Sequence, residues 1–320
     1  MDALPDLLRV VRADAALYST FLGRGRWGVA TRGAPGAVFH AVLSGAGVLR
    51  AEGAPALDFS AGDLLLLPHG SAHVIADAAE TPGRWIRELP VREEPGALPE
   101  VLAGEHGPTG AQAARGDTSD LPPPTRILCG TLRFDPDSRE LLLPQLPTVL
   151  HARGGGAATA WIAATAALAA EEAARDQGAA ELLLARLADV LLVQVLRAHA
   201  AGEGRGWLGA LADPVLARPL RLLHAEPARD WSVAELARRA GVSRTVLFER
   251  FQARLGEPPG TWLLRWRMWL ARRALRRAEA RVGEVGRSVG YQSEAAFTRA
   301  FTRAVGATPT AWRKAQLAPA

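Results

Sequence analysis

The stretch GYQSEAAFTRAFTRAVGATPTAWR, residues 290–313, predicts a short helix near the end of the chain. Ser293 is suited to accept hydrogen bonds from the first backbone N–H groups of a helix, and Gly306 and Pro309 are typical of residues that follow a helix end. Phe297 and Phe301 stand four residues apart and share one face, which we expect to be buried. The outward residues would be Glu294, Ala295, Thr298 and Arg299. Such a helix is either an ordinary surface helix or one that enters a groove.

The same arrangement occurs earlier in the chain, with the two cap serines, Ser243 and Ser293, 50 residues apart. Gly241 supplies a turn, and Ser232 with Glu235 forms a capping box for a helix before that turn. Two short helices joined by a glycine-containing turn form a helix-turn-helix, whose second helix can lie in the major groove of DNA. A long helix at about 261–278 would join the two copies. The predicted buried residues are Ala234, Leu236, Ala237, Ala240, Val246, Leu247 and Phe251 in the first copy, and Val282, Val285 and Val289 in the second.

Matching residues extend over roughly the last hundred positions. They are Leu236, Ala237, Gly241, Val242, Ser243, Leu247, Phe251, Leu255, Gly256, Pro258 and Pro259, then Val289, Gly290, Tyr291, Ser293, Phe297, Phe301, Gly306, Thr308, Pro309, Trp312 and Arg313. This pattern resembles the AraC/XylS family of bacterial transcription regulators. Family members often have a small polar residue and then Arg ahead of the apolar position, whereas this chain has Phe248, Glu249 and Arg250.

The resemblance implies that the second helix of each copy is a recognition helix for double-stranded promoter DNA, and that RNA polymerase is a partner. Arginine pairs best with guanine, threonine can contact a base edge or a thymine methyl, and glutamate can accept from cytosine. The candidate base-contacting residues are Arg244, Thr245, Glu249, Glu294, Ala295, Thr298 and Arg299. Arg265, Arg272 and Arg287 are expected to contact phosphates, which positions the protein without reading sequence.

Charge is segregated along the 320 residues. From Asp213 onward there are 20 Lys+Arg against 9 Asp+Glu, a balance of +11, whereas the preceding residues carry a balance of −6. This asymmetry predicts an acidic domain joined to a basic one that binds a polyanion. No apolar run is long enough to span a membrane, and a single cysteine fits the cytoplasm.

The first 150 residues predict short strands separated by Gly, Pro and Asp, which is typical of a sandwich or small barrel. Residues 103–125 are rich in Gly, Pro and Thr and predict a flexible loop. The expected strands are 37–43, 47–52, 57–59, 64–67, 73–75 and 126–134.

Residues 156–200 are rich in Ala and Leu with helical spacing. Their apolar stripe is Leu183, Leu187, Val190, Leu191 and Val195. This stripe could pack on the protein's own barrel or form a helix–helix interface in a homodimer, and both alternatives stay open.

The segment GDLLLLPHGSAHVIAD, residues 62–77, resembles the second motif of the cupin fold at Gly62, Pro68, Gly70 and His73, with Asp77 where that motif has Asn. The resemblance implies that His73 points into a barrel. Metal-binding cupins usually add a His-x-His and a Glu from an earlier strand, whereas here His40 is followed by Val42. His40 and His73, with His69 as a third imidazole, could hold a soft or borderline metal ion. DNA binding requires no cofactor.

Cys129 lies in ILCGTLRFD, which together with LPDLLRVVR near the N-terminus resembles the cupin-type sensor domain of a subgroup of AraC-like regulators. As a buried strand residue, Cys129 would be an inert small hydrophobe. As a sensor it could form a sulfenic acid, a mixed adduct or an intersubunit bridge, because no second cysteine is present.

These observations predict an α+β multidomain protein. A cupin-like β-barrel sensor (1–150), a helical linker or dimerisation segment (151–206) and an all-α double helix-turn-helix domain (207–320) follow one another. The predicted function is a cytoplasmic transcription regulator, activating and without enzymatic activity, that senses a small molecule, metal or reactive species through His40, His69, His73 and Cys129. The alternatives are a cupin-type metal-dependent enzyme with an accessory DNA-binding module, and a nonspecific architectural binder.

Overall fold

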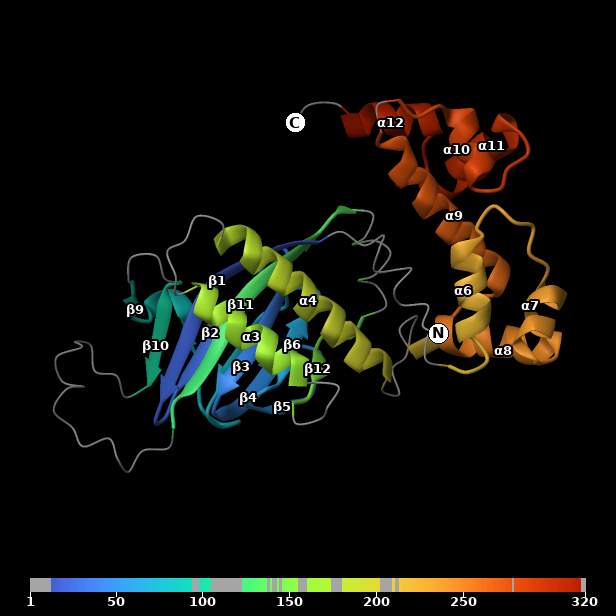
Figure 1. The fold of residues 1–320 in the computed structure, drawn as a ribbon. Helices are drawn as coiled ribbons and strands as arrows, with labels where there is room; N and C mark the ends of the chain where they lie inside the picture. Colours follow the sequence, from blue (N-terminus) through green and yellow to red (C-terminus); the bar gives the residue numbers. More distant parts are fainter. Residues whose placement is uncertain are drawn as a thin grey trace. The chain divides into compact units, whose positions relative to one another are not determined.

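The computed structural model describes residues 13–93, 98–104, 123–136, 139, 143, 146–154, 160–173, 180–201, 209–210, 213–277 and 279–317. They divide into two compact units. One contains the strands and two helices between residues 13 and 199, and the other contains the helices from 217 to 317 (Figure 1). Most of the predicted loop at 103–125 lies outside the described residues.

The first unit is built from two sheets. The larger has the order β12-β6-β3-β11-β1-β10-β9, and the smaller has the order β5-β4-β7-β2-β8. The larger sheet comprises β1 (Ala13–Arg24), β3 (Ala37–Ser44), β6 (Leu64–Leu67), β9 (Val91–Arg92), β10 (Glu100–Gly104), β11 (Thr125–Phe134) and β12 (Leu150–Ala152). The smaller comprises β2 (Gly28–Thr31), β4 (Ala46–Ala51), β5 (Leu57–Ser60), β7 (His73–Ala76) and β8 (Arg84–Trp85), and η1 (Ile86–Glu88) follows β8. The expected strands are all present, and the sequence prediction missed β1, β2, β8, β9, β10 and β12.

Apolar side chains from both sheets form one core. It includes Phe21 and Trp27, Val42 of β3, Ile75 of β7 and Ile127 of β11. Antiparallel pairing places β11 directly beside β3, with Cys129 opposite His40. A polar and a thiol side chain are thereby brought together inside an apolar interior, where each needs a hydrogen-bond partner.

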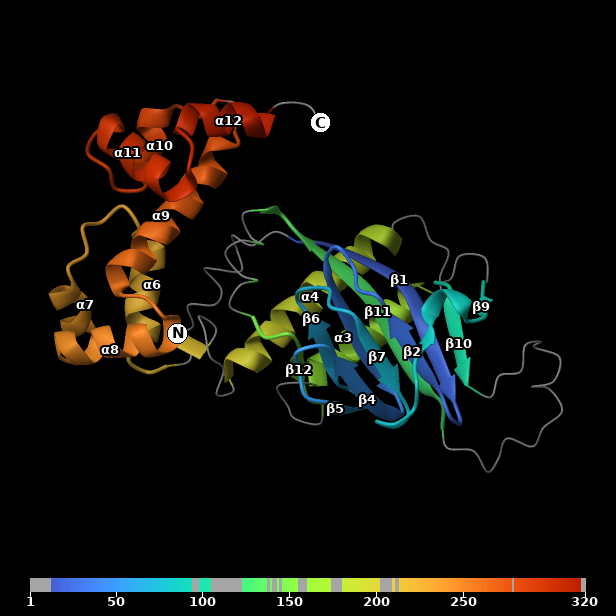
Figure 2. The same cartoon turned by 180° about the vertical axis from the view of Figure 1, so that it is seen from behind.

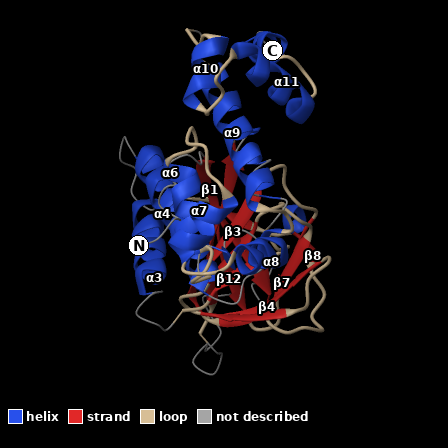
Figure 3. Ribbon diagram, turned by 90° about the vertical axis from the view of Figure 1, so that its right-hand side faces the viewer, coloured by secondary structure: helices blue, strands red, loops and turns tan. Residues whose placement is uncertain are grey.

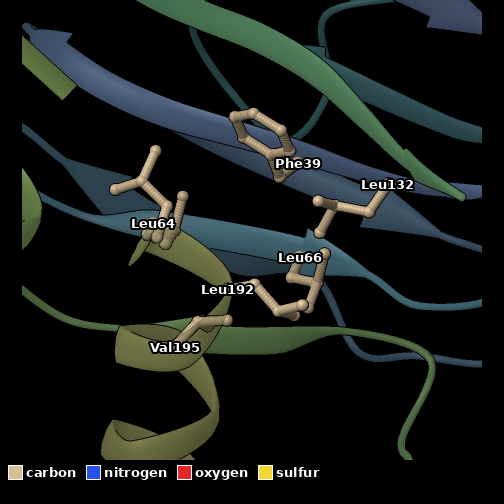
Figure 4. A pocket seen from close by; sticks show the side chains of 7 residues that line it. Phe39, Leu64, Leu66, Leu132, Leu192 and Val195 are labelled. Atoms are coloured by element: carbon tan, nitrogen blue, oxygen red, sulfur yellow. The ribbon is translucent and has the colours of Figure 1, made fainter. Parts of the chain in front are cut away.

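Helices α3 (Ala160–Ala173) and α4 (Ala180–Ala201) lie on the face of the larger sheet (Figures 1 and 2). Leu191, Leu192 and Val195 of α4 pack against side chains of the sheet (Figure 4). The side chains that they meet are Phe39, Leu64, Leu66 and Leu132. Gly130 makes room for this layer, because a Cβ there would lie 2.3 Å from the Phe39 ring.

This packing supports the first of the two alternatives for the apolar stripe, in which α4 packs on the protein's own sheet. The buried face differs from the predicted one, since Val190 is 43% exposed whereas Leu192 and Leu196 are buried. The side chain of Leu183 lies outside the described residues. No helix in the described part of the chain is long and apolar enough to cross a membrane.

The second unit consists of helices joined by short loops (Figure 3). They are α6 (Ala217–Ala225), α7 (Val233–Ala240), α8 (Arg244–Leu255), α9 (Pro259–Leu275), α10 (Val282–Ser288), α11 (Glu294–Val305) and α12 (Pro309–Leu317). α9 is the predicted connecting helix. It begins earlier than expected because Pro259 occupies the first helical position, where its missing N–H costs nothing.

The caps of the two helix-turn-helix copies form as predicted. Ser232 Oγ accepts a hydrogen bond from Glu235 N at 3.1 Å, and Gly241 adopts the left-handed conformation at φ 72°. The capping box is only half formed, because the Glu235 carboxylate pairs instead with Arg229 and Arg239. Two residues predicted to be buried are exposed, Ala234 on α7 and Val246 on α8. Ala234 lies two positions before the buried Leu236, and Val246 lies one position before the buried Leu247.

Candidate nucleic-acid interface and buried histidine site

Helix α8 starts at a serine cap and ends at a left-handed glycine. Ser243 Oγ accepts from Val246 N at 3.2 Å, and Gly256 has φ 73°. The side chains of Leu247, Phe251 and Leu255 are buried on the inner face, at spacings of four residues. The candidate base-contacting residues Arg244, Thr245 and Glu249 are all exposed. Val246, which was predicted to be buried, is exposed on this helix, and so is Phe248.

Helix α11 repeats this arrangement. Ser293 Oγ accepts from Ala296 N at 3.2 Å, and Gly306 ends the helix with φ 82°. Phe297, Ala300 and Phe301 form the buried face, where the two phenylalanines pack against Met268, Ala271 and Leu275 of α9.

Three of the four candidates on α11, Glu294, Ala295 and Arg299, are exposed, and Thr298 is half-buried. The Glu294 carboxylate lies close to α10, because a Cβ on Gly283 would be 2.7 Å from its Oε2. Glu294 therefore leans toward α10, whereas Arg299 is directed to solvent.

Several arginines of the basic unit stabilise the fold. Arg265 pairs with Glu257 at 2.8 Å and lies over the ring of Trp262, so the expectation that it contacts phosphate is not supported. Arg267 donates to the carbonyl oxygens of Pro227 and Arg229. Arg272 is half-buried, whereas Arg287 is exposed. Only part of the excess positive charge is thus available for DNA.

Asp213 joins the start of this unit to helix α8. One of its carboxylate oxygens accepts from Val215 N at 2.9 Å, which caps the turn before α6. The other oxygen lies 3.5 Å from Arg250 and 3.4 Å from Arg254 of α8. A buried carboxylate thereby fixes the inner side of α8.

His40, His73 and Cys129 meet in the interior between the two sheets. The Nε2 atoms of His40 and His73 are 2.9 Å apart, and His40 Nδ1 lies 3.2 Å from Cys129 Sγ. All three side chains are buried. Three of the four residues predicted for the sensor site are thus connected, with His40 in contact with both His73 and Cys129.

The hydrogen-bond partners fix the direction of each bond in this network. His73 Nδ1 is 2.8 Å from the carbonyl oxygen of Ser71, which can only accept, so Nδ1 carries a hydrogen. His73 Nε2 then accepts from His40 Nε2–H, and His40 Nδ1 is left to accept the Cys129 S–H. Thr31 Oγ1, 3.0 Å from His73 Nδ1, completes the surroundings and was missed from the sequence because no motif marks it.

Burial keeps the network neutral. It lowers the pKa of His40 well below its ordinary value, with a further contribution from His73, and it lowers the pKa of His73. Burial also raises the pKa of the Cys129 thiol to about 12. His40 therefore donates to His73 and accepts from Cys129 at once, and a change at either neighbour removes one of its hydrogen-bond partners.

His69 lies outside this network. Its side chain is exposed, and its Nε2 lies 3.1 Å from the carbonyl oxygen of Leu146. The reason is the strand period, because His69 sits on the glycine corner between β6 and β7 and not on a strand face. The corner itself forms as the motif implies, with Gly70 at φ 63°. Asp77 accepts a hydrogen bond from Trp27 N at 3.0 Å and has a structural role.

The donor set at this site is small for a metal ion. Cys129 contacts Nδ1 of His40, whereas the two imidazoles face each other through Nε2, so thiol and imidazoles do not converge on one point. Within the described ranges, no group of three or more His, Cys, Asp or Glu side chains has the arrangement of a metal site. Two nitrogens are fewer than the ligands of the usual protein zinc sites.

Comparisons with known proteins agree with both halves of the chain. A cupin family matches residues 2–201, and a helix-turn-helix domain family matches residues 236–315. A relative from Streptomyces antibioticus, described as an AraC-like transcription regulator, is 35% identical over 323 residues, covering 98% of this chain and 99% of the relative. The HTH-type transcriptional regulator AlkR of Acinetobacter baylyi is 24% identical, and the match covers 98% of this chain and 99% of AlkR.

The RCS-specific HTH-type transcriptional activator RclR of Escherichia coli is 27% identical over 201 residues, covering 61% of this chain and 70% of that protein. Among solved structures, the DNA-binding domain of AdpA in complex with a target DNA is 32% identical. It covers 32% of this chain and 92% of that one, with a TM-score of 0.30.

Proposed function

We propose, from the premise that this chain belongs to the AraC-like transcription regulators with an N-terminal cupin domain, that its two recognition helices read a promoter under the control of the His40–His73–Cys129 site. The chain is a DNA-binding transcription regulator. The proposal adds which residues read DNA, which residues sense a signal, and that the protein is a cytoplasmic activator without enzymatic activity. The repeated cap, turn and outward face of α8 and α11 carry the proposal.

The two recognition helices are held in one unit by α9. Helices so joined are proposed to enter successive major grooves on one side of the DNA, separated by about one helical turn, ~34 Å. One chain would then contact two short subsites in tandem, α8 in one and α11 in the other. RNA polymerase and a second copy of the chain are the further proposed partners.

Replacing Arg299 by Ala is expected to weaken binding to the selected site by about 1–3 kcal/mol and to relax the base preference at one position of one subsite. The reason is that an exposed arginine in the first turns of α11 can bind guanine O6 and N7 together. The measurement is fluorescence anisotropy on the selected site and on its single-base variants.

Arg281→Ala is the matched control, because Arg281 is exposed and pairs with Glu284 outside the recognition helices. It is expected to bind like the parent. An Arg299→Ala protein that weakens evenly on all sequences would reassign Arg299 to a phosphate. One that binds every site as the parent does would mean that α11 does not face DNA.

The buried network suits a sensor because its protons are mutually dependent. An oxidant or electrophile that consumes the Cys129 thiol would remove a hydrogen-bond donor to His40. β3 carries His40 toward this site and the neighbouring Phe39 toward α4. A change at His40 would therefore also act on the helix that precedes the DNA-binding unit.

The double variant His40→Ala, His73→Ala is expected to lose the response to the inducing signal while its DNA affinity stays within about twofold of the parent, because the two units have separate cores. Response is measured with a promoter reporter exposed to oxidants, transition-metal salts and small organic compounds. Circular dichroism checks that the sheets still form.

His69→Ala is the control for this experiment, since His69 is an exposed histidine on the glycine corner between β6 and β7, outside the network. It is expected to respond normally. A folded double variant with a normal response would show that the network only packs the barrel. The milder variant Cys129→Ser removes the thiol and keeps a side chain of similar size, so it separates loss of the thiol from loss of packing.

A further inference from the structure

Two apolar side chains stand on the outer surface of α8. Val246 is 40% exposed and Phe248 is 47% exposed, whereas Leu247, Phe251 and Leu255 of the same helix fill the core. Neither Val246 nor Phe248 is needed for the buried face, which is complete without them. A single exposed apolar side chain needs no explanation by itself, so the place of Phe248 in the internal repeat has to carry the argument.

The internal repeat assigns Phe248 a position. Because Ser243 and Ser293 both cap their helices, Phe248 stands where Thr298 stands in α11, and Glu249 stands where Arg299 stands. Thr298 and Arg299 are proposed base-contacting residues of α11. Phe248 therefore occupies a base-contacting position of α8, three residues after Thr245 and on the same side of the helix.

The chemistry of the major groove restricts what such a residue can recognise. Adenine, guanine and cytosine present hydrogen-bonding atoms there, and thymine adds the C5 methyl group, the one apolar group on a base edge in the groove. A phenyl ring over donors or acceptors would strip their water without replacing their hydrogen bonds, which is unfavourable. A phenyl ring over a thymine methyl buries apolar surface on both sides.

We propose that Phe248 reads thymine methyl groups in the subsite bound by α8, while α11 reads its subsite through hydrogen bonds from Arg299. This inference rests on the proposed function. It makes the two subsites chemically different, so the orientation of the protein on DNA would follow from which subsite carries the thymines.

The experiment starts with selection of binding sites by the full-length protein from random DNA. Each thymine of the selected site is then replaced by uracil, which removes only the C5 methyl. With the parent protein, at least one replacement in one subsite is expected to weaken binding about 4-fold, the equivalent of one buried methylene. Replacements in the other subsite are expected to have little effect.

The Phe248→Ala protein is expected to bind the thymine site about 5- to 10-fold more weakly than the parent does. It is expected to bind the thymine and uracil sites with the same affinity, so that discrimination between them disappears. Phe248→Leu, which keeps an apolar side chain, is expected to retain part of it. Leu264→Ala is the control, because Leu264 is a 38% exposed apolar residue on α9 and is expected to change nothing.

A parent protein that binds thymine and uracil sites equally, or a Phe248→Ala protein that still distinguishes them, would overturn the inference. So would a Phe248→Ala protein with unchanged DNA binding and reduced promoter activation, since Phe248 would then contact a protein such as RNA polymerase. Selection that yields no preferred sequence at all would overturn the proposed function itself, and the two failures are therefore distinct.

Discussion

Lowering the pH from 7 to 4 is expected to cost the helical unit about 3 kcal/mol in free energy of unfolding through His224 alone. His224 is the single histidine after residue 201. The centroid of its ring lies 4.4 Å from that of Trp266, with the two planes tilted by 34°, and its Nε2 accepts a hydrogen bond from Trp262 Nε1 at 3.2 Å. Burial lowers the pKa of His224 from 6.5 to about 4.

The sign of this pH effect on stability follows from proton binding at His224. Between pH 6.5 and 4 the unfolded chain binds a proton at His224 and the folded chain does not, so acid favours the unfolded state. The stabilisation by the neutral ring is fully present above pH 6.5 and decreases as the pH falls through this window. Protonation in the folded state would also remove the lone pair that Trp262 uses.

The measurement is urea unfolding, followed by tryptophan fluorescence, at a series of pH values. His224→Gln is the matched variant, because its side-chain oxygen can still accept from Trp262 and does not titrate. The difference in unfolding free energy between parent and variant isolates His224 from the carboxylates. If this difference stays constant from pH 7 to 4, His224 is not held neutral by the fold.

The helical unit was predictable from sequence because its signals are local. Serine caps, left-handed glycines and phenylalanines four residues apart act within one helix, and Ser243, Gly241 and Phe251 all have their predicted roles. The errors at Ala234 and Val246 arose at the edges of faces. Val246 is one position from the buried Leu247, a rotation of about 100°, and Ala234 is two positions from the buried Leu236, so the side that each takes depends on neighbouring helices.

The histidine site was only partly predictable, because it is assembled from distant strands. Resemblance to the second cupin motif marked His73, and comparison with the His-x-His of metal-binding cupins marked His40, but their contact depends on how the two sheets pack. The bond from Cys129 to His40 depends on the register between β11 and β3. Long β1 was missed because ADAALYSTFLGR has small and polar residues where alternation would be expected. No local pattern marks Thr31 or the exposure of Phe248.

Raising the salt concentration from 50 to 200 mM is expected to weaken DNA binding by the full-length protein about 10³-fold, the value for about six neutralised phosphates. The balance of +11 from Asp213 onward would suggest more contacts. Arg265, Arg267 and Arg254 are committed to ion pairs or backbone carbonyls within the unit and are expected to release no counterions. Exposed arginines on and beside the proposed recognition helices are expected to supply the contacts.

Two single variants test this division of the arginines. Arg287→Ala removes an exposed side chain on α10 and is expected to reduce the slope of log affinity against log salt by about one. Arg265→Ala removes the partner of Glu257 and is expected to lower stability while leaving that slope unchanged. Binding that does not depend on salt would contradict phosphate contact by this unit. An equal fall of the slope in both variants would mean that Arg265 leaves Glu257 when DNA binds. The ion pair would then be exchanged for a phosphate contact, and the fold would adjust on the operator.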